Sequence, residues 1–170
     1  RTTMVTNAFL FGTDNYWFQY KDNPCNGHGV SLKAGNPEQL EKLTGVSRFD
    51  VLTKGISRVN SLSPTYVSIV YGPDYRNNLL ELVTLAMECG AKGISIDFCR
   101  GFVNNGSIDD SSTGTYKEIV EDFVRDYDEL NRITGGNVSI QMSMPFCVWP
   151  ADFVQKLINR RQATSVCHVI

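Results

Sequence analysis

Apolar positions along the chain follow two rhythms, short continuous or alternating runs and longer stretches with a spacing of three to four. The short runs are rich in β-branched and aromatic residues and end near turn residues, which predicts strands. These runs occupy residues 2–11, 30–32, 66–71, 93–98 and 138–144. The longer spacing predicts helices over about residues 36–45, 47–59, 76–89, 115–134 and 150–158, and a polar loop over 103–114.

The first predicted helix carries recognisable start and stop signals. Asn36 is a suitable N-cap, Pro37 suits the first helical position, and Gln39 is placed to complete a capping box. Gly45 then provides the stop that a glycine offers just after a helix.

Alternation of strands and helices predicts an α/β fold with a parallel sheet built from βα repeats and right-handed crossovers. About five to six strands fit the chain. A closed eight-stranded barrel needs about 200–250 residues, whereas this chain has 170. We therefore expect an open sheet or a partial (β/α) barrel of TIM type. Ligands in such folds bind at the carboxyl ends of the strands, which places the candidate residues at 6–8, 31–35, 71–74, 97–100 and 144–147.

Charge and hydropathy argue against two classes of binding partner, nucleic acids and membranes. A formal net charge of −2 gives no basic footprint for nucleic acid. No apolar run reaches the roughly 18–20 residues of a membrane span, and no signal-peptide pattern is present, so we expect a cytoplasmic protein without a membrane partner.

The cysteines and histidines give weaker signals. Five cysteines at wide spacing argue against a disulfide framework. Cys89 lies in an apolar helical pattern and is expected in the core, while Cys99 could be an accessible thiol at a strand end. His28 and His168 lack metal-ligand spacing, and both are expected to face solvent.

Several strand ends, taken in order, resemble the barrel of radical S-adenosylmethionine (radical SAM) enzymes. Thr6-Asn7-Ala8 resembles the family's TNG-type strand, with Ala8 in place of glycine. The stretch from Gly29 to Leu52 resembles its fourth strand and the helices that follow. Val67–Tyr71 with residues 77–79, and then residues 90–94, resemble the fifth strand and the entry to the sixth.

The end of the chain resembles the stretch that leads into a cysteine-rich (SPASM-type) extension of peptide-modifying members. Residues 145–149 and 166–169 carry this likeness, which divides the chain into a partial barrel, 1–145, and the start of an extension, 146–170. It implies that Cys147 and Cys167 could ligate an auxiliary iron–sulfur cluster. An ordinary role as free thiols is the alternative.

The resemblance implies a parent enzyme that uses S-adenosylmethionine and a [4Fe–4S] cluster to generate a 5′-deoxyadenosyl radical, with a peptide or small-molecule substrate. It places the cofactor near Asn7, Ser31, Lys33 and Asp97. Ser31 and Lys33 would project from one face because strand side chains alternate. For three of these residues a structural role remains an alternative. Asn7 could be a turn former, Ser31 an ordinary polar residue of the sheet, and Asp97 the ion-pair partner of Arg100.

The family's C-x₃-C-x₂-C motif is absent from this sequence. We therefore expect the chain alone to be unable to hold the catalytic cluster or perform the reaction. Because a strand pattern begins at once after Arg1, the chain is expected to start in the middle of a fold.

Two other functions remain open. The run Gly93–Phe98 also resembles a strand of glycosidase-like barrels, in which Asp97 would need a second carboxylate about 5–10 Å away, with Asp74 and Asp14 as the candidates. Alternatively, the chain is a non-catalytic interaction module whose open sheet edges pair with another copy or another protein.

Overall fold

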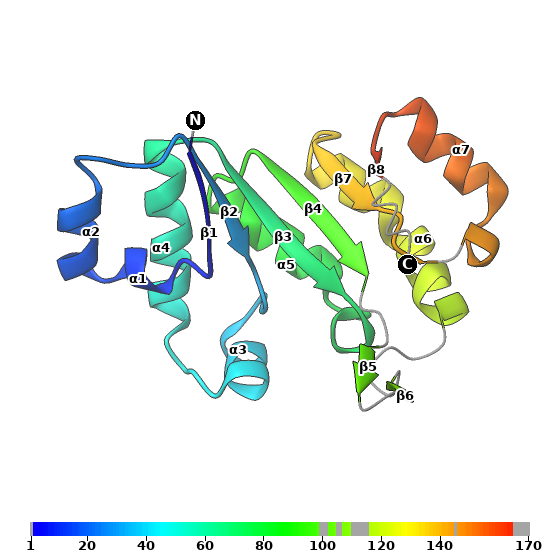
Figure 1. The fold of residues 1–170 in the computed structure, drawn as a ribbon, viewed down its shortest axis with the longest axis horizontal. Helices are drawn as coiled ribbons and strands as arrows, with labels where there is room; N and C mark the ends of the chain where they lie inside the picture. The colour runs from blue at the N-terminus through cyan, green and yellow to red at the C-terminus, as the bar shows by residue number, and fades with distance from the viewer. Residues whose placement is uncertain (1, 99–101, 105–106, 110–115, 145, 165–170) are drawn as a thin grey trace.

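The computed structural model describes residues 2–98, 102–104, 107–109, 116–144 and 146–164, with only the backbone described at 74, 102–104, 107–109 and 146. Six parallel strands form one sheet in the order β1-β2-β3-β4-β7-β8, and β5 with β6 forms a separate antiparallel hairpin (Figure 1). The strands of the sheet are Thr3–Thr6, Gly27–Ser31, Thr65–Tyr71, Gly93–Phe98, Val138–Gln141 and Ala163–Thr164. The expected α/β fold with βα repeats is confirmed.

Helices connect the parallel strands. They are α1 (Phe9–Gly12), α2 (Asp14–Tyr20), α3 (Pro37–Thr44), α4 (Phe49–Leu62), α5 (Leu79–Glu88), α6 (Tyr116–Ile133) and α7 (Ala151–Asn159), with 3₁₀ turns η1 (Pro73–Tyr75) and η2 (Phe146–Val148). The hairpin consists of β5 (Phe102–Asn104) and β6 (Ser107–Asp109).

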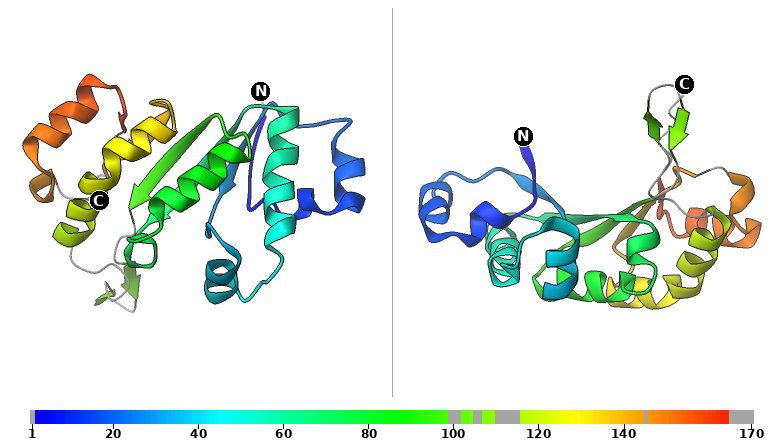
Figure 2. Two further views of the ribbon diagram at one scale, coloured as in Figure 1. Left: turned by 180° about the vertical axis from the view of Figure 1, so that it is seen from behind. Right: turned by 90° about the horizontal axis from the view of Figure 1, so that it is seen from below.

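The strand order identifies the type of α/β architecture. Successive strands of the main sheet are also spatial neighbours, so no reversal of order occurs as it would in a doubly wound sheet. Helices α4, α5 and α6 cover one face of the sheet, and the other face carries none of them (Figure 2). This arrangement is that of a partial (β/α) barrel.

The core lies between the sheet and this helical layer. Along β3, the residues that face the helices, Val67, Ile69 and Tyr71, are fully buried, and their counterparts on β4 are equally buried. An aromatic cluster fills the space beneath β4 and β7, where Phe98, Phe123 and Trp149 pack edge to face. Burial of apolar area on this scale is the dominant favourable contribution to folding.

Several local expectations are corrected. Residues 2–11 do not form one buried strand: β1 ends at Thr6, Ala8 adopts a left-handed φ of 66°, and α1 begins at Phe9. The predicted polar loop contains β5 and β6. The predicted cap of α3 is confirmed, since Asn36 Oδ1 accepts a hydrogen bond from the Gln39 amide, but the Gln39 side chain accepts from Gly35 N and not from Asn36.

The segment expected to start a C-terminal extension contributes to the same sheet. Helix α7 follows η2, and β8 then pairs in parallel with β7. Residues 146–164 thus supply one more helix–strand unit, while residues 165–170, including Cys167 and His168, lie outside the described residues.

Helix α1 and the turn before it meet α4 through unusually close backbone contacts. A Cβ placed on Gly55 of α4 would lie 2.0 Å from the Ala8 carbonyl oxygen, and one placed on Gly12 would lie 1.9 Å from the Val51 carbonyl oxygen. Only glycine permits α1 to approach α4 this closely. The contact holds the turn after β1, and therefore Asn7, in a defined position.

Candidate functional site: the open face of the sheet

A row of four serines crosses the face of the sheet that α4, α5 and α6 leave uncovered. Ser31 of β2 pairs in register with Ser68 of β3, Ser68 with Ser95 of β4, and Ser95 with Ser139 of β7. Closed TIM barrels fill the equivalent interior with bulky branched side chains. The small hydroxyl side chains make this row polar, while Tyr66 and Val70 of β3 are exposed on the same face.

Three of the four residues predicted to contact a cofactor lie together at the rim where β1 and β2 end, beside α3 and α4. Asn7, Ser31 and Lys33 line a cavity of ≈ 380 Å³ at the carboxyl ends of β1 and β2. The remaining lining residues are mostly apolar: Phe9, Leu40, Leu43, Thr44, Val46 and Leu52. A mostly apolar cavity with a few convergent polar groups is typical of small-molecule sites.

The polar groups of this cavity differ in how far they are already engaged. Asn7 Oδ1 accepts a hydrogen bond from Phe9 N at 3.3 Å, as a turn former does. Ser31 and Lys33 make no side-chain hydrogen bond or ion pair with any other residue that the structure describes. Lys33 is also the sole charged residue of the lining. The cavity thus offers one cation and one hydroxyl that are open to a ligand.

The turn beside the cavity explains one detail of the sequence. Ala8 occupies the left-handed region, with a φ of 66°, and its amide donates to Thr6 Oγ1 at 3.0 Å. Glycine adopts this conformation without steric cost. Ala8 therefore stands where the backbone favours glycine.

Asp97 lies on the same face but outside this cavity. It is two residues beyond Ser95 on β4, and its Oδ1 accepts hydrogen bonds from Ser143 Oγ at 2.7 Å and from Phe98 N at 2.8 Å. The ladder between β4 and β7 stops at Ile96 and Ile140, so the Asp97–Ser143 hydrogen bond links the two strands where their backbone pairing ends. Its expected partner Arg100 lies outside the described residues.

Of the two carboxylates proposed as partners of Asp97, Asp14 is engaged elsewhere in the molecule. Asp14 lies on α2, beyond β1 at the edge of the sheet, and β2 and β3 lie between β1 and β4 (Figure 1). There it pairs with Lys54 at 2.9 Å and Arg58 at 2.5 Å, and hydrogen bonds from these two cations lower the pKa of its carboxyl group. The side chain of Asp74 is not described.

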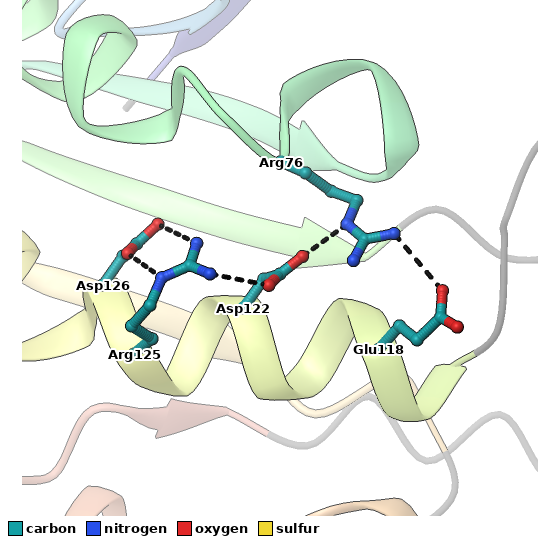
Figure 3. Close-up of polar contacts among 5 residues, drawn as sticks. All are labelled: Arg76, Glu118, Asp122, Arg125 and Asp126. Atoms are coloured by element: carbon teal, nitrogen blue, oxygen red, sulfur yellow. Dashed lines mark hydrogen bonds and ion pairs between the residues drawn. The ribbon is translucent and has the colours of Figure 1, made fainter.

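An ion-pair network reinforces the outer side of the same sheet end. Arg76, which follows η1, contacts Asp122 and Glu118 of α6, and Arg125 bridges Asp122 and Asp126 (Figure 3). These groups tie the β3–α5 connection to α6. Because each charge has a partner within the network, its role is structural.

His28 is a correction to the sequence interpretation. It is 1% exposed, with its ring nitrogens 2.7 Å from Tyr20 Oη and 2.8 Å from Ser63 Oγ. Burial lowers the pKa of its imidazole. His28 is therefore a buried residue of β2 with both ring nitrogens in hydrogen-bonding contact, and does not face solvent as the sequence predicts.

The cysteines give no metal site in the described region. Cys147 is exposed, and Cys89 is half-buried with its Sγ 3.8 Å from the Thr53 carbonyl oxygen. Among the described residues, no group of three or more His, Cys, Asp or Glu side chains is arranged to hold a metal ion. Cys99 and Cys167 lie outside those residues, so the auxiliary-cluster hypothesis stays a prediction.

Within the described part of the chain, no helix combines the length and apolarity that a membrane crossing requires.

Comparisons with known proteins do not identify a family for this chain. No protein-family model matches the sequence, and no curated protein matches it either.

Proposed function

We propose that this chain forms the cofactor-facing part of a radical SAM-type enzyme, and that the cavity at the ends of β1 and β2 binds S-adenosylmethionine. The observation that carries the proposal is the convergence of Asn7, Ser31 and Lys33 on that one cavity. The resemblance selected these three residues from the sequence. They lie at or just beyond the ends of β1 and β2, and Asn7 is more than twenty residues away from the other two along the chain.

The lining fits the chemistry of this cofactor. The aliphatic side chains of Leu40, Leu43 and Leu52 offer an apolar wall for an adenine ring. Ser31 and Asn7 supply hydrogen-bonding groups for ribose hydroxyls, and the Lys33 ammonium suits the carboxylate of the methionine part. A volume of ≈ 380 Å³ falls within the range of about 300–1,000 Å³ that is common for small-molecule pockets.

The catalytic iron–sulfur cluster does not fit the residues of this chain. Three cysteine ligands at C-x₃-C-x₂-C spacing are absent from the sequence, and the described residues hold no alternative metal cluster. In the parent enzyme the cluster supplies the electron that cleaves the sulfonium. The part proposed for this chain is to bind and orient the nucleoside and to expose it to the open face.

Calorimetric titration of the chain with S-adenosylmethionine, and separately with S-adenosylhomocysteine, tests the binding step. We expect saturable 1:1 binding that is weakened about tenfold by Ser31→Ala or Lys33→Ala, since each removes about 1.4 kcal/mol of hydrogen bonding or ion pairing. Ser139→Ala is the matched control, because Ser139 belongs to the same serine row but lies outside the cavity. Binding that is absent, or that is equally sensitive to Ser139→Ala, contradicts the proposal.

Reconstitution with iron and sulfide tests the second part. The chain alone is expected to show no [4Fe–4S] absorption and no cleavage of S-adenosylmethionine. Robust cleavage would show that the cluster is held by residues other than those of the family motif.

A further inference from the structure

A second cavity lies at the opposite end of the strands. It has a volume of ≈ 430 Å³ and lies at the amino ends of β3, β4, β7 and β8. Its polar lining comes from the strands and from the two loops that enter β7 and β8: Tyr66, Ser95, Asn137, Ser139, Arg160, Arg161 and Gln162. The residues of the cofactor cavity do not take part in it.

The charged residues that line this second cavity are both cationic. Arg160 and Arg161 line it, and no carboxylate does. Arg160 is already engaged: its Nη1 donates to Tyr127 Oη at 3.1 Å and lies 3.8 Å from Asp128, which also pairs with Lys156. The guanidinium of Arg161, in contrast, makes no hydrogen bond or ion pair with any residue in the described part of the chain. One guanidinium is therefore left to a ligand.

The backbone of Arg161 adopts a left-handed conformation just after α7. Arg161 has a φ of 55° and closes α7 in a Schellman-type turn, in which Arg161 N donates to Ile158 O and Gln162 N to Leu157 O. Elsewhere in the described chain, the helix ends with positive φ carry glycine, as at Gly45 and Gly90. A non-glycine residue in this conformation costs roughly 1–2 kcal/mol. An arginine at this position therefore destabilises the turn, and it lines the cavity.

Neutral hydrogen-bond donors surround the free arginine. Ser95 and Asn137 have side chains without a hydrogen-bond partner among the described residues, and Ser139 Oγ shares a 3.3 Å contact with Thr164 Oγ1. Gln162 is committed to Tyr127, Asn131 and Gly136. The available groups are thus a planar five-donor guanidinium, hydroxyl groups and an amide, which together suit an oxyanion with several acceptor oxygens.

We propose that this cavity binds the phosphate group of a small molecule, with Arg161 as the bidentate ligand and Ser95, Ser139 and Asn137 as additional donors. The site is separate from the proposed cofactor cavity, and its occupation does not depend on the radical SAM assignment. Phosphate is preferred to a carboxylate because the donors come from two strands and two loops, and a tetrahedral group presents oxygens in more directions than a planar one.

The test is an NMR titration of the isotope-labelled chain with inorganic phosphate at constant ionic strength, with acetate as a second arm. We expect saturating shifts at the amides of 136–139 and 160–162, and at least tenfold weaker saturation with acetate. Arg161→Gly is the decisive variant, because glycine accepts a φ of 55° and the fold is retained while the guanidinium is lost. We expect it to weaken phosphate binding at least tenfold and to leave the melting temperature unchanged or higher.

Arg48→Ala is the matched control, since it removes one exposed arginine remote from this cavity and should leave the titration unchanged. Phosphate shifts that do not saturate, or that survive Arg161→Gly, overturn the proposal. Equal affinity for acetate and phosphate overturns the assignment of the ligand as a phosphate.

Discussion

The two faces of the sheet are made from alternate residues of the same strands, yet they differ in almost every respect. On β3 the face beneath the helices carries Val67 and Ile69 at 0% exposure, whereas the open face carries Tyr66 at 58% and Val70 at 48%. The covered face is closely packed and apolar. The open face has a row of serines, and the cavities lie at the two ends of the strands. Stability is therefore concentrated on one face, and the capacity to bind ligands on the other.

The largest expected difference between the faces comes from neighbouring residues of β4. Ile96 faces the helices and is fully buried, while Ser95 lies on the open face. Ile96→Ala is expected to lower the free energy of unfolding by about 4 kcal/mol, because it removes buried methyl groups and leaves a cavity. Ser95→Ala should change it by less than about 0.5 kcal/mol. Urea denaturation measures both, and similar losses would contradict the division into two faces.

A pair of glycines provides a second comparison. Gly55→Ala places a methyl group 2.0 Å from the Ala8 carbonyl oxygen, so α1 and α4 must separate, and we expect a loss of about 3 kcal/mol. Gly29 lies on the open face, where a Cβ meets only Val5 Cγ2 at 3.6 Å. Gly29→Ala should be neutral or stabilising by about 0.5 kcal/mol. Equal thermal shifts for the two variants would show that the α1–α4 approach is not tight.

Asp97 and Ser143 form a polar contact on the open face. Ser143→Ala removes a donor from a half-buried carboxylate and is expected to cost about 1 kcal/mol. Ser68→Ala is the control, since its hydroxyl makes no hydrogen bond with another described residue. If chemical denaturation gives the same small effect for both variants, Asp97 does not depend on this hydrogen bond.

The smallest expected effect concerns the pH dependence of the covered side. Burial lowers the pKa of His28 below its ordinary value of 6.5, so the unfolded chain takes up a proton at a higher pH than the native one. The free energy of unfolding should therefore decline as pH falls through 6.5. His28→Gln should reduce this decline, although it costs stability at neutral pH. Melting temperatures recorded from pH 8 to pH 5.5 would contradict this if wild type and variant fell in parallel.

The family resemblance selected the candidate site residues, and sequence order indicated how three of them are arranged. Strand alternation indicated that Ser31 and Lys33 share a face, and the parallel topology indicated that Asn7 lies near them. Their common cavity agrees with this reasoning. Asp97 was grouped with them because it also ends a strand, but it lies on β4 and is bonded to Ser143, a residue 46 positions away. Binding by any of the four stays a prediction.

Strand alternation and sheet topology do not predict the second cavity. Its arginines follow a helix that the sequence did predict, but β8 is only two residues long and gives no periodic signal. The positive φ of Arg161 is equally invisible, because glycine is the residue that usually marks such a turn.

Local patterns in the sequence were sufficient to determine the βα repeats, the parallel sheet and the cap of α3, because these depend on spacings of two and of three to four residues. Which face of each strand is buried, how closely α1 approaches α4, and the burial of His28 depend on residues far apart in the chain. Only the tertiary structure decides them, since packing brings together groups whose proximity no local pattern records.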